Sequence, residues 1–247
     1  MLLTSVLMFI SCGVAIPEKL FMNLRRVTTV LFATLALSGA TLSRAAISSI
    51  AAARALPAGS VVSIRGTVTV PAGSFASSTF DQGFGLQDAT GGIYITMPDN
   101  AGLTAGRHVR VTGTLGDDGY GLVVLRVAGI ADVRRVAGTA DPAPLPVATG
   151  ALGEATEGVL LDVSGTVTRG PTNDMPYGYS VFIDDGSGET QVFIPASTGI
   201  NPFRIPFVKV DNCMRVIGFG GQYETPDKNQ YEVLPRFRSD IQTIPCS

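Results

Sequence analysis

Residues 62–70 read Val-Ser-Ile-Arg-Gly-Thr-Val-Thr-Val, and apolar and polar side chains alternate along most of this stretch. Alternation with a period of two is typical of a half-buried β-strand. Similar short segments follow within about 70 residues, with no pattern for a helix longer than a turn or two. The further segments are 84–88, 93–96, 108–113 and 122–127. Five short strands of this kind predict a small barrel or sandwich.

The pattern then occurs a second time. Gly165-Thr-Val-Thr echoes Gly66-Thr-Val-Thr, and three further matches follow in the same order. These pair Val181–Gly188 with Phe84–Gly91, Val192–Ile194 with Ile93–Ile95, and Arg215–Gly218 with Arg110–Gly113, at offsets of about 97–105 residues. We therefore predict a tandem duplication, with a first domain over 57–136, a Pro-rich linker over 137–146 and a second domain over 147–247.

The N-terminal 45 residues read as an export leader. A basic Arg25-Arg26 pair precedes the apolar stretch 27–40, and Ser43-Arg44-Ala45 is a small-x-small cleavage site. This predicts a cleaved signal peptide over 22–45, and no stable membrane span after cleavage. Residues 1–21 form a second apolar run, which we interpret as a mis-assigned start. Phe9–Cys12 loosely resembles a lipobox, but no basic residue precedes it, which counts against lipoprotein anchoring at Cys12.

Composition limits the function classes. Without residues 1–45, 14 Lys and Arg face 19 Asp and Glu, which leaves a net charge of −5. Non-specific nucleic-acid binders are usually basic, so this balance counts against such a role unless the arginines cluster on one face. One His in the chain argues against His-dependent triads and most zinc sites. We expect no catalytic site, no metal and no cofactor.

The motifs resemble a known family of modules. Gly66–Val70, Phe84–Asp88, Gly91–Ile95 and Arg110–Gly113 are similar to the OB-fold modules that accompany bacterial extracellular nucleases and other exported proteins. Gly220–Tyr223 with Tyr231–Ile241 resembles the closing hairpin of the family. The resemblance covers most of residues 57–245. It implies two tandem five-stranded OB-fold (Greek-key) barrels in an all-β chain, and nucleic-acid binding without an imported active site.

Alternation assigns candidate ligand contacts to the outer surface of the barrels. Tyr94 lies between Ile93 and Ile95, and Phe193 holds the matching position in the second repeat. The same reasoning directs Arg65, Arg110 and Arg215 outward. An OB-fold binds oligomers with aromatic side chains that stack and basic groups that contact the backbone. The alternative is that both aromatic residues pack under a loop or between the barrels.

Two further patterns have structural explanations. Cys213 and Cys246 are the only cysteines after the leader, and an even pair in an exported protein predicts a disulfide. Asp117-Asp118 and Asp184-Asp185 could ligate calcium, but Asp-Gly pairs are also ordinary turn residues.

Two functions follow from these observations. The first is a non-catalytic, secreted or periplasmic module that binds single-stranded DNA or RNA, with an extracellular nuclease as a possible partner. The second is a cell-envelope structural or interaction module that binds a protein or a glycan. Acidity and only three lysines favour the second, whereas the outward aromatic and Arg sets favour the first.

Overall fold

The computed structural model describes residues 46–140 and 142–246. Several predictions fall outside these residues: the leader over 1–45, the signal peptide over 22–45, and the Cys12 lipobox. Residues 141 and 247, which belong to the predicted linker and second domain, also lie outside. The described part is all-β apart from a few short helical turns, as predicted.

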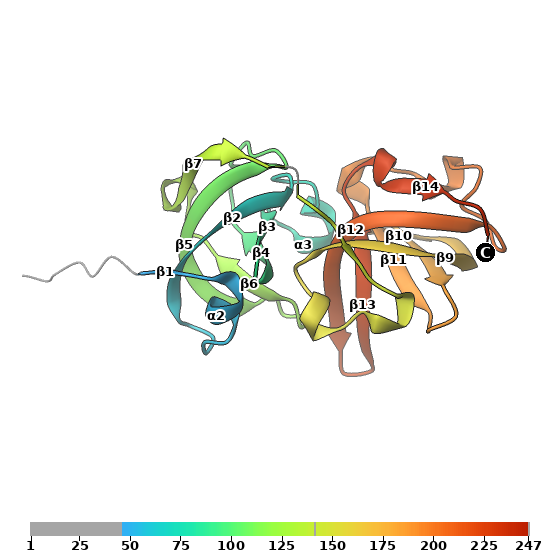
Figure 1. The fold of residues 1–247 in the computed structure, drawn as a ribbon, viewed down its shortest axis with the longest axis horizontal. Helices are drawn as coiled ribbons and strands as arrows, with labels where there is room; N and C mark the ends of the chain where they lie inside the picture. The colour runs from blue at the N-terminus through green and yellow to red at the C-terminus, as the bar shows by residue number, and fades with distance from the viewer. Residues whose placement is uncertain (1–45, 141, 247) are drawn as a thin grey trace, which may run out of the picture. The chain divides into compact units, whose positions relative to one another are not determined.

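The first sheet closes into a five-stranded barrel (Figure 1). Its strands lie in the order β2-β3-β4-β6-β5, and a β2–β5 pairing closes the ring. Only β4 and β6 run parallel, while the other four pairings are antiparallel. This Greek-key order is that of an OB-fold. The bounds are β2 Val61–Val70, β3 Phe84–Asp88, β4 Gly91–Thr96, β5 Arg107–Asp117 and β6 Val123–Arg126.

The second sheet has the same ring order. Its strands run β9-β10-β11-β13-β12, a β12–β9 pairing closes the ring, and β11 and β13 are the parallel pair. Each strand therefore occupies the position of its counterpart in the first ring. The bounds are β9 Leu160–Asp174, β10 Gly178–Asp184, β11 Thr190–Pro195, β12 Cys213–Thr225 and β13 Lys228–Pro235.

Four strands extend the two rings, and the sequence did not predict them. In the first sheet β1 (Ile47–Ser48) pairs with β2, and β7 (Val133–Thr139) pairs with β5. In the second, β8 (Leu145–Pro146) pairs with β9, and β14 (Ile241–Thr243) pairs with β12. Most of their side chains are not buried, so they lack the alternation that reveals a half-buried strand. The predicted linker 137–146 starts inside β7 and ends in β8.

In residues 46–140 and 142–246, helical structure is confined to short turns. The two α-helices are α2 (Ile50–Arg54) and α3 (Ala76–Thr79), the first of which Ser49 caps by accepting a hydrogen bond from the Ala52 amide. Helix α2 lies in the stretch 47–56 that the Ala-rich composition makes helix-prone. Six 3₁₀ turns are described: η1 Ile130–Asp132, η2 Thr149–Ala151, η3 Glu154–Thr156, η4 Ala196–Thr198, η5 Pro202–Arg204 and η6 Arg238–Asp240.

Each ring encloses its own core. Ile64, Val68 and Leu86 are fully buried in the first, and Val163, Val181 and Ile183 in the second. The predicted disulfide is confirmed: Cys213, the first residue of β12, is bonded to Cys246, with Cα atoms 5.2 Å apart. It ties the C-terminal segment to the second ring.

Candidate functional site: an arginine row and an aromatic cavity

Three arginines lie side by side on the outer face of the first ring. Arg65 of β2 pairs with Arg110 of β5, and Arg110 pairs with Arg134 of β7. Residues directly opposite each other in antiparallel strands point to the same face, with Cβ atoms about 4.5–5.5 Å apart. We call Arg65, Arg110 and Arg134 the arginine row. Arg65 and Arg134 are exposed, and Arg110 is half-buried.

The middle of the row is held in place by a buried hydroxyl. Arg110 donates from Nε to Ser63 Oγ at 2.8 Å, and Ser63 is completely buried. Neither Arg65 nor Arg134 forms an ion pair with any residue in 46–140 or 142–246. Arg65 and Arg134 therefore present positive charge on one surface, on either side of Arg110.

The equivalent position in the second ring is neutralised. Arg215 corresponds to Arg110, but its partner is the Asp162 carboxylate, which accepts from Nε at 2.7 Å and from Nη2 at 2.6 Å. This carboxylate raises the pKa of Arg215. The strand neighbours of Arg215 are Ser164 and Gln242, where the first ring has Arg65 and Arg134. Arg215 thus lies on an outer face but outside any arginine row.

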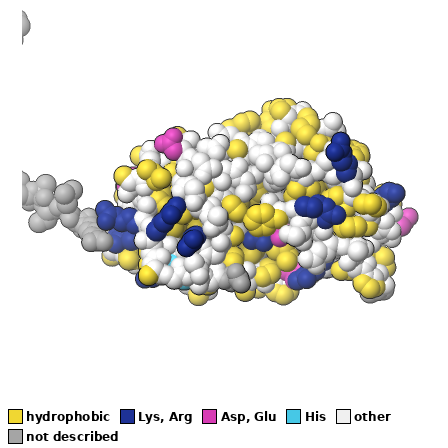
Figure 2. All heavy atoms as spheres, turned by 90° about the horizontal axis from the view of Figure 1, so that it is seen from above, with side chains coloured by type: hydrophobic (Ala, Val, Ile, Leu, Met, Phe, Trp, Pro, Cys, Tyr) yellow, Lys and Arg dark blue, Asp and Glu magenta, His cyan; other side chains and the backbone are white. Residues whose placement is uncertain are grey.

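Charge is distributed unevenly between the two halves. Residues 46–140 contain seven Lys and Arg against six Asp and Glu, a net charge of +1, whereas 142–246 contain seven against twelve, a net charge of −5. In Figure 2, dark-blue side chains lie over both parts of the surface shown. The acidity of the chain is therefore a property of its second half.

The prediction that Tyr94 is an exposed stacking residue is wrong. Tyr94 points out of the first barrel core, as alternation requires, but it is only 1% exposed. It belongs to a separate apolar cluster with Phe75, Phe193 and Phe219, which combines residues of both rings. Its ring lies 5.8 Å from that of Phe219, edge to face. The surface on which an isolated OB-fold would bind a ligand is here covered by the second ring.

The Tyr94 hydroxyl is also occupied within the protein. It donates to Asp81 Oδ1 at 3.2 Å and lies 3.3 Å from Thr79 Oγ1. Burial, followed by the charge of Asp81, raises the pKa of Tyr94 well above its usual value. Burial likewise raises the pKa of Asp81. This hydroxyl is a fixed structural hydrogen-bond donor.

Phe193 is buried, as Tyr94 is. It is 7% exposed and packs in the shared cluster, so the expectation of an outward stacking ring is wrong for it too. The alternative stated for both residues, packing between the barrels, is the one observed. Neither aromatic residue lies on the strands of the arginine row, so the five predicted contacts do not form one surface.

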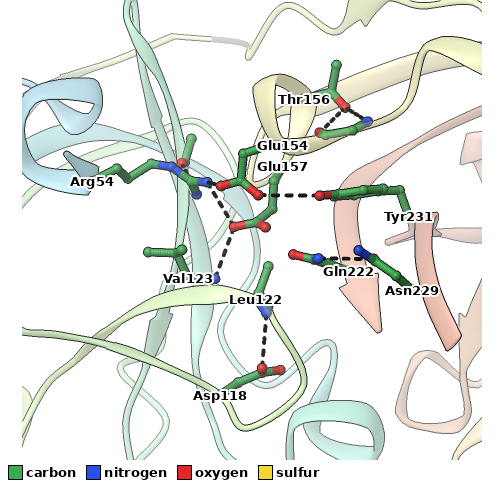
Figure 3. Close-up of polar contacts among 12 residues, drawn as sticks. Arg54, Asp118, Leu122, Val123, Glu154, Thr156, Glu157, Gln222, Asn229 and Tyr231 are labelled. Atoms are coloured by element: carbon green, nitrogen blue, oxygen red, sulfur yellow. Dashed lines mark hydrogen bonds and ion pairs between the residues drawn. The ribbon is translucent and has the colours of Figure 1, made fainter. Parts of the chain in front are cut away.

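Polar contacts hold the rings together beside this cluster (Figure 3). Arg54 of α2 pairs with Glu157 at 2.9 Å and with Glu154 at 3.1 Å. Glu157 is completely buried at its side chain and also accepts from the Val123 amide at 3.0 Å. Burial raises its pKa, and Arg54 opposes that shift. Glu157 thus has a basic partner 103 positions away, which the sequence alone does not reveal.

A cavity of about 460 Å³ opens between the rings, lined by Tyr94 and Phe193 together with other aromatic side chains. Its walls come from the β2–β3 and β5–β6 connections of the first ring and the β9–β10 and β12–β13 hairpins of the second. These are the loop positions that OB-folds use for ligands. The cavity is therefore a second candidate site, separate from the arginine row.

The acidic pairs considered for calcium serve as turn caps. Asp118 accepts hydrogen bonds from the Tyr120 and Leu122 amides, and Asp184 accepts them from Gly186 and Gly188. Within the described ranges no group of three or more His, Cys, Asp or Glu could hold a metal ion. Likewise, no described helix is long and apolar enough to cross a membrane.

Most residues of the two sites were missed from the sequence. Arg134 lies on β7, whose mostly exposed residues give no strand pattern. Glu232 and Lys228 lie in the cavity wall. Arg110 lies on a strand with a neighbour on each side, so a residue lies opposite it on both neighbouring strands. A search of the sequence for the second of these residues could have found Arg134. The cavity could not have been found, because it requires the docking of two rings.

Comparisons with known proteins place the chain in no family. No family model matches it, and no curated protein matches it. Among solved structures, "hypothetical protein ygiW from E. coli" is 19% identical, covers 37% of this chain and 90% of its own, and has a TM-score of 0.29. A "murine DNA binding protein bound with ds DNA" is 12% identical over 75% of this chain and 97% of its own, with a TM-score of 0.40.

A third similar structure is a "Replication Protein A Heterotrimer Bound to ssDNA", 9% identical over 82% of this chain and 70% of its own, with a TM-score of 0.28. At these scores the likenesses establish neither a relationship nor a ligand. The link to bacterial extracellular nucleases stays a prediction.

Proposed function

We propose that this protein is an exported, non-catalytic pair of tandem OB-fold modules that binds single-stranded nucleic acid through the arginine row of its first module. The phosphate backbone is the group that the row recognises. The identical ring order of the two sheets supports the tandem arrangement. The Cys213–Cys246 disulfide supports an oxidising compartment outside the cytoplasm.

One observation carries the proposal: three arginines lie opposite one another in the first ring, where the second ring has only one. In the second ring Asp162 neutralises Arg215, and the flanking positions are Ser164 and Gln242. In the first ring both positions that flank Arg110 are exposed arginines, Arg65 and Arg134. The fold does not require a charged row at this place, since the second ring does without it.

A row of like charges favours an external anion. Like charges directly opposite each other on neighbouring strands destabilise a sheet. An anion that contacts all three guanidinium groups removes this repulsion. Arginine is suited to the purpose because its planar fork donates two parallel hydrogen bonds to phosphate oxygens. Successive phosphates of one strand offer several such anions to a row.

The acidic second half sets the strength of binding. A polyanion meets attraction from the first module and repulsion from residues 142–246, whose net charge is −5. We therefore expect weak binding that needs low salt. An extracellular nuclease that acts on the bound strand belongs to the same proposal as a partner.

The test compares two double variants in a fluorescence-polarisation titration with a labelled single-stranded oligonucleotide at low salt. The first is Arg65→Gln with Arg134→Gln, which leaves Arg110 and its bond to Ser63 in place. The matched control is Arg204→Gln with Lys209→Gln, which removes two exposed positive charges from the second half. Both variants change the net charge equally.

We expect the row variant to bind at least about tenfold more weakly than the parent, because two charge-assisted contacts are lost. The control should stay within about twofold to threefold of the parent, as befits a general charge effect. Equal losses in both variants would show that only net charge matters. No binding by the parent would instead favour the envelope-interaction function.

A further inference from the structure

The cavity between the rings has a lining that the nucleic-acid proposal does not use. At about 460 Å³ it falls within the size range of small-molecule sites. Nine of its lining residues are Phe or Tyr, and its charged residues are Asp118, Asp174, Glu232 and Lys228. When Glu232 is ionised, three carboxylates face one ammonium, which makes the cavity unsuited to a phosphate. They make it complementary to a cation.

Aromatic pairs from different rings flank the opening. Tyr120 of the first ring and Tyr223 of the second are stacked with their centroids 5.2 Å apart and an interplanar angle of 19°. Phe80 and Tyr177 meet edge to face at 5.6 Å. All four side chains are more than 40% exposed, although large aromatic side chains usually bury their surface. Each pair thus keeps ring surface accessible at the rim.

Phe80 is held in an unusual backbone conformation at this rim. Its φ of 57° is left-handed, a conformation that a bulky non-Gly residue rarely adopts, and its side chain is 69% exposed. Phe80 ends helix α3, and its amide donates to the Ala76 carbonyl at 3.0 Å. This helix end holds the exposed ring at the rim of the cavity.

Glu232 is the buried carboxyl of the cavity wall. It is 8% exposed, and no hydrogen bond or ion pair joins its carboxyl to any residue of the described part. Its neighbour across the parallel pairing, Gln191, is instead bonded to Ser180 Oγ at 3.0 Å and to Lys228 Nζ at 3.3 Å. The Glu232 oxygens are not among the fully enclosed side-chain atoms without a partner, so the carboxyl is open to the cavity, where a ligand can complete it.

We propose that the cavity binds a small organic cation of the alkylammonium type, with its charge against Glu232 and its alkyl groups against the aromatic walls. Aromatic faces attract ammonium groups within about 6 Å of their centroids, and the attraction grows when the group leaves water. The protein itself contains such a cation–π contact at the rim, where Lys228 Nζ is 5.6 Å from the centroid of Tyr223. The ammonium group of the ligand would make the same kind of contact with aromatic rings inside the cavity.

Binding of a cation should release a proton. Burial raises the pKa of Glu232 to about 8, with Lys228 opposing and with Asp174 and Asp118 reinforcing the shift. Glu232 of the empty protein is therefore mostly protonated at pH 7. A bound cation stabilises the carboxylate, and the proton passes to the buffer. Affinity should rise with pH up to about 8 and level off above it.

The experiment uses choline and its uncharged carbon isostere, 3,3-dimethyl-1-butanol, in calorimetric titrations of the whole protein. We expect choline to bind at least about tenfold more tightly than the isostere. Titrations at pH 7 in two buffers of different ionisation enthalpy should show release of nearly one proton per choline. Lowering the pH from 8 to 6 should weaken choline binding by more than about tenfold.

Glu232→Gln is the decisive variant, and Glu224→Gln is its control on the exposed part of β12. The first should lose both the preference for choline and the pH dependence, and the second should keep both. Equal affinity for choline and the isostere, binding without proton release, or no binding at all would overturn the proposal. Binding of a neutral sugar in place of choline would overturn it as well.

This outcome is independent of the nucleic-acid proposal. The arginine row lies on β2, β5 and β7, whereas the cavity is built from other strands and loops. The Arg65→Gln, Arg134→Gln variant should therefore bind choline like the parent. The comparison of choline with its isostere uses the parent protein, without any substitution in the cavity. A folding defect in Glu232→Gln would therefore not obscure that comparison.

Discussion

At the scale of single residues, the direction of a side chain and its exposure are separate properties. Alternation correctly places Tyr94 outside the first barrel core, since its neighbours Ile93 and Ile95 are fully buried in that core. It does not reveal what covers the outer face. Tyr94 and Phe193 occupy matching positions in the two repeats, and both are buried because the rings share one apolar cluster.

Tyr94→Ala should therefore destabilise the fold. Removing a buried aromatic side chain costs about 3–5 kcal/mol in unfolding free energy, because it leaves a cavity. Tyr94→Phe should cost about 1 kcal/mol, since it removes only the hydroxyl that bonds to Asp81. Urea unfolding of the two variants checks both values. A Tyr94→Ala protein as stable as the parent would show that this cluster does not hold the rings together.

Glu232 makes stability depend on pH. Its pKa rises from 4.5 in the unfolded chain to about 8 in the folded protein, so the folded state binds the proton more tightly. This contribution is fully present below pH 4.5 and is lost as the pH rises through 8. The loss is at most about 5 kcal/mol, because one pKa unit corresponds to about 1.4 kcal/mol.

Glu232→Gln should remove that dependence. The variant should gain stability over the parent steadily between about pH 5 and 8, and the difference should be constant above about pH 8.5. Urea unfolding of the variant and the parent across this pH range measures the difference between their unfolding free energies. The contributions of the other buried carboxyls are the same in both proteins and cancel in this difference. A difference that does not change with pH would contradict the assigned environment of Glu232.

At the scale of strands, the same pairing produces different surfaces. Strands β2, β5 and β7 bring three arginines together, while β9, β12 and β14 bring together Ser164, Arg215 and Gln242. The difference lies in the flanking residues, which are arginines only in the first ring. The second ring thus carries one arginine, paired with Asp162, where the first carries three.

Ser63→Asp should lower the positive charge of the arginine row. The new carboxylate would lie beside Arg110, whose Nε donates to Ser63 in the parent, and nucleic-acid binding should weaken by about threefold to tenfold. Asp162→Ser, the reverse change, should leave binding unchanged or strengthen it. Polarisation titrations of both variants provide the measurement. Stronger binding by Ser63→Asp would show that Arg110 does not contact the phosphates.

At the scale of the whole molecule, local patterns predicted the rings and missed what the rings form together. Period-two alternation located all five strands of the first ring, and the echoes at offsets of about 97–105 located four of their five counterparts. The disulfide followed from cysteine number. Each of these depends on neighbouring residues or on a repeat, which a single sequence displays.

The cavity and the cluster around Tyr94 depend instead on contacts between residues about 100 or more positions apart. Tyr94 meets Phe219, and Arg54 meets Glu157, across the interface of the two rings. No spacing in the sequence encodes such a pair. Edge strand β7 was missed for a different reason, since its exposed residues lack an apolar face.

The arginine row as a phosphate-binding surface is the central claim, and the salt dependence of binding tests it most directly. For single strands the slope of log K against log salt is about −0.7 per phosphate neutralised, so three arginines predict a slope near −2. Affinity for single-stranded DNA should then fall about 20-fold between about 50 and 200 mM salt, and only about threefold in Arg65→Gln, Arg134→Gln. A slope near zero for the parent, or equal slopes for the two proteins, would contradict the claim.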